Sequence, residues 1–144
     1  PLNFSTEALD VSKAEFNKIV KAINNAYINF YWLTSTTDII ESKDIPEGFI
    51  KALEDDLNLP NAVKEIWSVS KSLTNLIRTK DTNGIEKALN QLHNMFNILG
   101  LISKNILEDS EIRSKVDSWK TALDSKDYTT ADKTRKELQD KEII

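Results

Sequence analysis

Residues that interrupt helices are scarce in this chain, with only 3 Gly and 3 Pro among its 144 residues. An all-β fold needs turn residues after every short strand, so this composition excludes such a fold and favours long helices. The hydrophobic fraction of 40% is enough for a buried core. The length fits one domain with at most a small appendage.

Apolar residues recur at three- and four-residue spacing along most of the chain, which predicts amphipathic helices. The predicted helices cover residues 6–35, 46–56, 60–79, 85–99, 112–123 and 128–138. Pro46 and Pro60 suit the first turn of a helix, and Gly100 suits a left-handed helix end. Residues 38–45 and 103–110 are predicted to be polar connections.

These helices predict an all-α fold, in which an antiparallel helical bundle over residues 1–105 precedes a C-terminal helical hairpin over residues 106–144. On the helix over 60–79, the residues expected to face the core are Val63, Ile66, Trp67, Ser70, Leu73 and Ile77. On the helix over 112–123, they are Ile112, Val116, Trp119 and Leu123.

Several kinds of chemistry are excluded by residue type. The chain has no Cys and a single His, so a thiolate zinc site, a cysteine nucleophile and a multi-histidine site are absent. The three glycines are too scattered for a phosphate-binding loop. Glu54, Asp55 and Asp56 are consecutive helical residues, whose carboxylates point in different directions. We therefore predict no catalytic residue and no metal ligand. No run of about eighteen apolar residues is present, so no membrane span is expected.

The charge balance is acidic, with a formal net charge of −4 and a pI of about 5.1. Basic nucleic-acid-binding domains lie well above that pI. In the last forty residues, lysines and arginines alternate with acids, which is typical of a solvated helix face. Two interpretations therefore remain open: a helical protein-interaction module with no RNA role, or a module that binds RNA with the help of a larger protein.

Four stretches resemble cysteinyl-tRNA synthetases, in the order and at the spacing found in that family. Residues 49–62 are similar to its Phe-x-x-Ala-Met-Asp-Asp-Asp-Phe-Asn-Thr-Pro-x-Ala segment. Residues 99–101 match a Leu-Gly-Leu that closes a bundle helix. Residues 126–138 are similar to a Lys-Asp-aromatic-x-x-Ala-Asp-x-x-Arg-x-x-Leu segment, and residues 2–5 resemble the start of the family's helical domain.

The resemblance implies a bundle of the class I synthetase anticodon-binding type, from the C-terminal part of a cysteine–tRNA ligase. The implied partners are cysteine-accepting tRNA and the catalytic domain of the parent chain. ATP and zinc are expected only in that catalytic domain, which has no counterpart here. We expect a cytoplasmic protein, a monomer, and a piece of a longer chain.

The same resemblance assigns candidate RNA-binding residues. Asp132 stands where the family reads anticodon bases, and Arg135 matches a basic position that can hold phosphate. The cations that flank them complete the set of candidates: Lys126, Lys133 and Lys136.

The chain also departs from the family pattern. Leu123 and Trp119 replace two arginines of the preceding helix. Glu142 stands where the family commonly has Gly before an apolar strand, which would follow Ile144. The loss of the two arginines puts the affinity for the anticodon in doubt. Because the strand would lie beyond Ile144, the hairpin over 106–144 is expected to be a truncated anticodon-contacting subdomain.

Overall fold

The computed structural model describes residues 6–55 and 58–144, with side chains described from residue 13 onward. The helices are α1 (Thr6–Thr34), α2 (Glu47–Glu54), α3 (Leu59–Arg78), α4 (Thr82–Ile98), α5 (Ser110–Asp124) and α6 (Tyr128–Asp140). A short 3₁₀ helix, η1 (Ile106–Glu108), precedes α5. No strand occurs in this part of the chain, so the predicted all-α fold is confirmed. Leu2–Ser5 and Asp56 lie outside the described residues.

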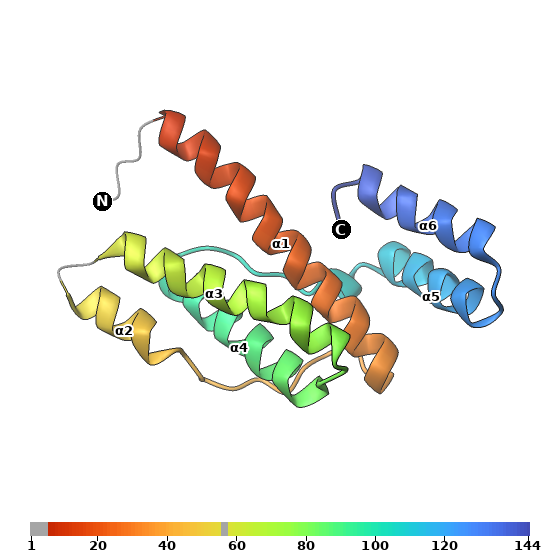
Figure 1. The fold of residues 1–144 in the computed structure, drawn as a ribbon, viewed down its shortest axis with the longest axis horizontal. Helices are drawn as coiled ribbons and strands as arrows, with labels where there is room; N and C mark the ends of the chain where they lie inside the picture. The colour runs from red at the N-terminus through yellow and green to blue at the C-terminus, as the bar shows by residue number, and fades with distance from the viewer. Residues whose placement is uncertain (1–5, 56–57) are drawn as a thin grey trace.

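The core lies where α2, α3 and α4 pack together and against the C-terminal half of α1 (Figure 1). Its largest fully buried side chains in the bundle include Ile28, Phe49, Leu73, Leu92 and Phe96. No described helix is long and apolar enough to cross a bilayer.

The inward face of α3 differs from the prediction. Ala62, Ile66, Ser70 and Leu73 are buried, whereas Val63 is 39% exposed and Trp67 is only partly buried. The small residues Ala62 and Ser70 lie on the buried side of α3 with Ile66 and Leu73, and this leaves Val63 and Trp67 at the edge of the contact. The prediction that Val63 faces the core is therefore wrong.

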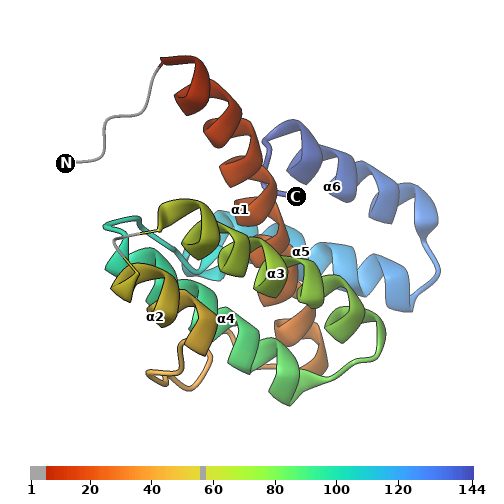
Figure 2. The same ribbon diagram turned by 60° about the vertical axis from the view of Figure 1, so that its left-hand side comes forward.

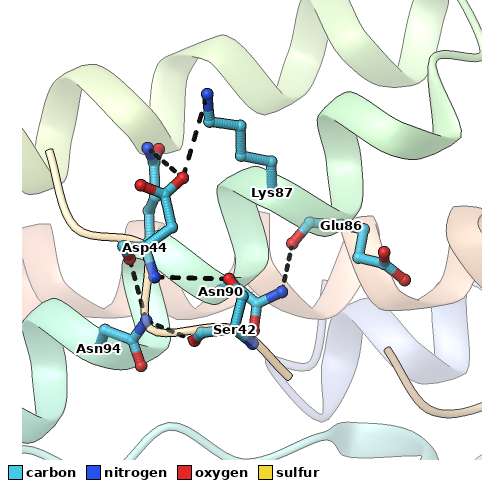
Figure 3. Close-up of polar contacts among 7 residues, drawn as sticks. Ser42, Asp44, Glu86, Lys87, Asn90 and Asn94 are labelled. Carbon is cyan, nitrogen blue, oxygen red and sulfur yellow. Dashed lines mark hydrogen bonds and ion pairs between the residues drawn. The ribbon is translucent and has the colours of Figure 1, made fainter. Parts of the chain in front are cut away.

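The loop between α1 and α2 is fixed to α4 by amide side chains (Figure 3). Asn90 is 3% exposed, and its Nδ2 donates to the Ile40 carbonyl at 2.9 Å while its Oδ1 accepts from the Ser42 N–H at 3.0 Å. The Asn94 Nδ2 donates to the carbonyls of Ser42 and Asp44 at 2.8 and 2.9 Å. Side chains of α4 thus supply hydrogen-bond partners that the backbone of the predicted polar loop lacks.

The connection between α4 and α5 is less polar than predicted. Leu107 lies in η1, is fully buried, and belongs to the same core cluster as the bundle residues. The Asn105 side chain caps η1 by accepting from the Leu107 N–H at 3.0 Å. Two adjacent apolar residues, Ile106 and Leu107, inside a polar stretch give no helical or strand periodicity, which is why the sequence did not indicate this contact.

The hairpin of α5 and α6 also contacts α1. The Tyr31 hydroxyl donates to Asp117 at 2.6 Å, and the Asn24 side chain donates to the Ile143 carbonyl at 2.9 Å. Val116, Leu138 and Ile143 join the core cluster of the bundle. The division into units 1–105 and 106–144 stays a prediction.

Left-handed residues follow five of the described helices: Ser35 after α1, Lys80 after α3, Gly100 after α4, Lys126 after α5 and Glu142 after α6. Gly100 has φ of 74°, as predicted, and Glu142 has φ of 58°. The N–H of Ile143 reaches back to the Leu138 carbonyl at 3.0 Å, which is the pattern that a left-handed residue permits. Gly adopts this conformation without steric cost, which fits the Gly that the resemblance implies at the position of Glu142.

Candidate nucleic-acid interface

The turn between α5 and α6 sets the start of the candidate RNA-binding helix. Lys126 has φ of 61°, and the Asp127 N–H returns to the Ala122 carbonyl at 2.8 Å. Asp127 then caps α6, because its carboxylate accepts from the Thr130 N–H at 3.2 Å and from the Thr130 hydroxyl at 2.6 Å. The Lys-Asp pair of the sequence motif therefore has a structural role in ending one helix and starting the next.

The two hydrogen bonds from Thr130, first from its hydroxyl and then from its N–H, hold the pKa of Asp127 below its usual value. A lowered pKa means that the ionised carboxylate stabilises the folded state above the unfolded pKa of about 3.9, and that this contribution is lost as the pH falls through the folded pKa. We expect the stability difference between the wild type and Asp127→Asn, measured by urea unfolding, to favour the wild type at pH 7 and to shrink toward pH 2. Because asparagine also caps helices, this comparison isolates the charge. A difference that does not change with pH would contradict the assignment.

All five predicted RNA-binding residues lie on the solvent side of the hairpin. Ala131, Thr134 and Leu138 are the buried residues of α6, whereas Lys126, Asp132, Lys133, Arg135 and Lys136 are exposed. The structure brings two of them together: the Arg135 guanidinium lies 3.6 Å from the Asp132 carboxylate. Both side chains are more than half exposed, so this ion pair is weak and can exchange for a ligand.

Tyr128 is a candidate that the sequence reasoning did not select. It is 60% exposed at the first turn of α6. Because Asp132 follows four residues later and Arg135 three residues after that, the three side chains share one side of the helix. The aromatic position in the Lys-Asp-aromatic segment of residues 126–138 was the sequence signal that could have indicated Tyr128. This side of α6 offers a ring for stacking, a carboxylate acceptor and a cation.

Trp119 of α5 packs against Trp32 of α1. Its ring meets that of Trp32 edge to face, with centroids 4.8 Å apart. The Lys120 ammonium lies 5.8 Å from the centroid of Trp32. Trp119 packs against the core cluster, as the helical pattern predicted, and it is not available to RNA in the way an arginine would be.

Leu123, at the second departure from the family pattern, is 36% exposed and does not belong to the core cluster. The prediction that it faces the core is wrong, because the turn after α5 begins only two residues later and no helix covers that side of it.

The remaining titratable groups do not gather into a metal-binding cluster in the part of the chain that is described. No group of three or more His, Asp or Glu side chains is close enough to hold an ion there. His93 lies on α4, where its Nε2 is 3.2 Å from the Asn97 amide nitrogen. Glu54 and Asp55 are exposed.

A comparison with protein families matches residues 48–103 to the DALR domain. The matched stretch begins within α2, contains α3 and α4, and ends in the connection that follows α4. No solved structure matches the chain.

Curated relatives extend the similarity to the whole chain. A cysteine–tRNA ligase of Bacillus cytotoxicus is 30% identical over 152 aligned positions, which cover 100% of this chain and 33% of that relative. A cysteine–tRNA ligase of Mycoplasmoides gallisepticum is 29% identical over 144 positions, with 100% of this chain and 32% of the relative covered. The resemblance drawn from the motifs is thereby confirmed. The chain spans about a third of the length of the curated relatives it matches.

Proposed function

We propose that this chain is the C-terminal, tRNA-binding part of a cysteine–tRNA ligase, and that α6 contacts the anticodon. The observation that carries the proposal is the similarity to cysteine–tRNA ligases over 100% of the chain. The exposed side of α6 supports it, because it presents residue types that bind unpaired bases.

Each residue of this side has a distinct role in the proposal. The ring of Tyr128 stacks on an unpaired base, which contributes affinity without selecting a sequence. The carboxylate of Asp132 accepts a hydrogen bond from a base amino or imino group, which selects the base. Arg135 is released from Asp132 and holds a phosphate. Lys126, Lys133 and Lys136 add attraction to the backbone that depends on salt and not on sequence.

The chemistry of aminoacylation is assigned to the rest of the parent protein. ATP and zinc are proposed to bind there, because this chain has no Cys, one His and no glycine-rich phosphate loop. The residues described here do not fit either group, so no reaction step is derived for them. The catalytic domain of the parent, a cytoplasmic location and a monomeric state belong to the same proposal.

The test is the binding of the chain to anticodon stem–loops in which single anticodon bases are changed. We expect the wild type to prefer the cysteine anticodon, and Asp132→Ala to lose about tenfold of the discrimination at one base while its mean affinity falls less. Fluorescence anisotropy at low salt is the measurement. Asp140→Ala removes an exposed acid from the other end of the same helix and should leave the discrimination unchanged.

Equal binding of every stem–loop by the wild type would remove Asp132 from the site. The alternative, a helical protein-interaction module with no RNA role, is supported by the net charge of −4. It would be favoured if the chain bound no tRNA even at low salt, where phosphate contacts are strongest.

A further inference from the structure

The α5–α6 hairpin is hydrogen-bonded to α1 at two points, which lie on the same side of that helix. Asn24 makes the first attachment and Tyr31 the second. Seven residues separate them, which is almost two helical turns and about 10.5 Å along α1. Figure 1 shows α1 between the hairpin and the other helices of the bundle. Two points along one helix fix a rotation of the hairpin that a single point would leave free.

The first attachment is buried and holds the end of α6. The buried Asn24 side chain donates from its Nδ2 to the Ile143 carbonyl at 2.9 Å. Ile143 is itself buried, and its N–H bonds to the Leu138 carbonyl at 3.0 Å, directly after the left-handed Glu142. This point therefore joins the C-terminal end of α6 to the middle of α1.

The second attachment is exposed to solvent and holds α5. The Tyr31 hydroxyl donates to the Asp117 carboxylate at 2.6 Å. This hydrogen bond raises the pKa of Tyr31, so the hydroxyl stays protonated and able to donate at neutral pH. Beside it, the rings of Trp32 and Trp119 meet edge to face. Trp119 stands where the resemblance implies an arginine, so at this position α5 presents a contact with α1 in place of a cation.

The start of α6 is the part of that helix farthest from α1. In Figures 1 and 2 alike, the turn between α5 and α6 points away from α1, whereas the end of α6 approaches it. The helical rise places Tyr128 about 18 Å from Asp140 along α6. A rotation of about 10° at the attachments would therefore move the start of α6 by about 3 Å, which is the length of a hydrogen bond.

We propose that Tyr31 and Asp117 are positioning residues, which set the orientation of α6 and thereby place the start of that helix for the anticodon. The proposal rests on the proposed function and adds to it two residues that do not touch RNA. One tRNA must reach α6 with its anticodon and the catalytic domain of the parent with its acceptor end. A hairpin that turns on α1 still binds an anticodon, but it no longer holds the rest of the tRNA in one place.

The first measurement follows the orientation of the hairpin. Because the chain has no Cys, spin labels can be attached to Thr74→Cys of α3 and Thr129→Cys of α6, both at exposed positions. We expect a narrow distribution of label distances, and a distribution about twice as wide in Tyr31→Phe, which removes only the hydroxyl. Thr34→Val is the matched control, because the Thr34 hydroxyl donates to the Phe30 carbonyl at 2.8 Å, within α1. Its distribution should stay narrow.

The second measurement is the aminoacylation of full-length cysteine-accepting tRNA by the parent ligase. We expect Tyr31→Phe to lower kcat/KM for the tRNA about tenfold. The affinity of the chain for an isolated anticodon stem–loop should change less than twofold, and its midpoint of thermal unfolding by less than about 2 °C, because the bond is exposed. Asp117→Ala should match Tyr31→Phe, whereas Asp117→Asn keeps an acceptor oxygen and should retain most of the activity.

The outcomes separate this proposal from the proposed function. It is overturned if Tyr31→Phe leaves the label distances unchanged, or if the distances spread while kcat/KM stays the same. An equal loss for the stem–loop and for the full-length tRNA also overturns it, because a local role in the site would then explain the effect. In these cases base discrimination by Asp132 still stands. If the wild-type chain binds no stem–loop at low salt, the proposed function fails, and this proposal fails with it.

Discussion

Leu138→Ala is expected to lower the free energy of unfolding by about 3 kcal/mol, which is typical of removing three buried carbons from a core position. For a chain of this size the midpoint of thermal unfolding should fall by roughly 10 °C. The reason is that Leu138 is fully buried where α6 meets α5 and α1. Circular dichroism during heating and urea denaturation gives both quantities.

The same measurement tests whether residues 1–105 and 106–144 unfold separately. Because Val116, Leu138 and Ile143 share one core cluster with residues of α1, we expect a single transition in the wild type and in the variant. Leu123→Ala, a change of the same size at a side chain that is 36% exposed, should cost less than about 1 kcal/mol. If two transitions are resolved and Leu138→Ala shifts only one of them, the hairpin is an independent unit.

The positions of the helices were predictable because they depend on local signals. Leu59–Arg78 begins beside Pro60, and the Asn58 side chain caps it by accepting from the Asn61 N–H at 3.3 Å. Gly100 ends α4 because glycine adopts the left-handed conformation, here with φ of 74°, without strain. Such signals act within a few residues, so a single sequence is enough to read them.

The side that a helix buries was harder to predict because it depends on the neighbouring helix. Trp67 fits the apolar pattern of α3, yet the close contact is made by Ala62 and Ser70. Trp119 fits the pattern of α5, but its partner Trp32 comes from α1, far away in the sequence. Periodicity identifies the apolar stripe, and the packing partner decides which edge of that stripe stays exposed.

The candidate RNA-binding residues also differ in whether a local sequence signal was enough to find them. Asp132 and Arg135 were found through a motif, and their contact at 3.6 Å follows from a spacing of three residues on a helix. Tyr128 was not selected, because only the structure shows that its side chain is 60% exposed on the same side of α6 as Asp132 and Arg135.

Asn90→Ala is expected to lower the free energy of unfolding by about 2–3 kcal/mol. The Asn90 side chain makes three hydrogen bonds, to the backbone of Ile40, Ser42 and Glu86, at distances of 2.9 to 3.1 Å. Alanine leaves the loop carbonyl of Ile40 and the loop N–H of Ser42 without these partners beside a side chain that is 3% exposed. The Glu86 carbonyl belongs to α4 and stays in the helical hydrogen-bond ladder, so the main loss is the attachment of the loop.

Two readouts distinguish this local role from a general loss of packing. Urea denaturation gives the change in the free energy of unfolding. In hydrogen exchange, Asn90→Ala should speed the exchange of the Ser42 amide, relative to the wild type, more than it speeds the exchange of core amides in α4. Asn97→Ala is the control on the same helix, because the Asn97 side chain is exposed and its amide nitrogen lies 3.2 Å from His93 Nε2, not from the loop. If both variants lose the same stability, or if the Ser42 amide stays as protected as in the wild type, the loop is held by its apolar contacts and Asn90 does not anchor it.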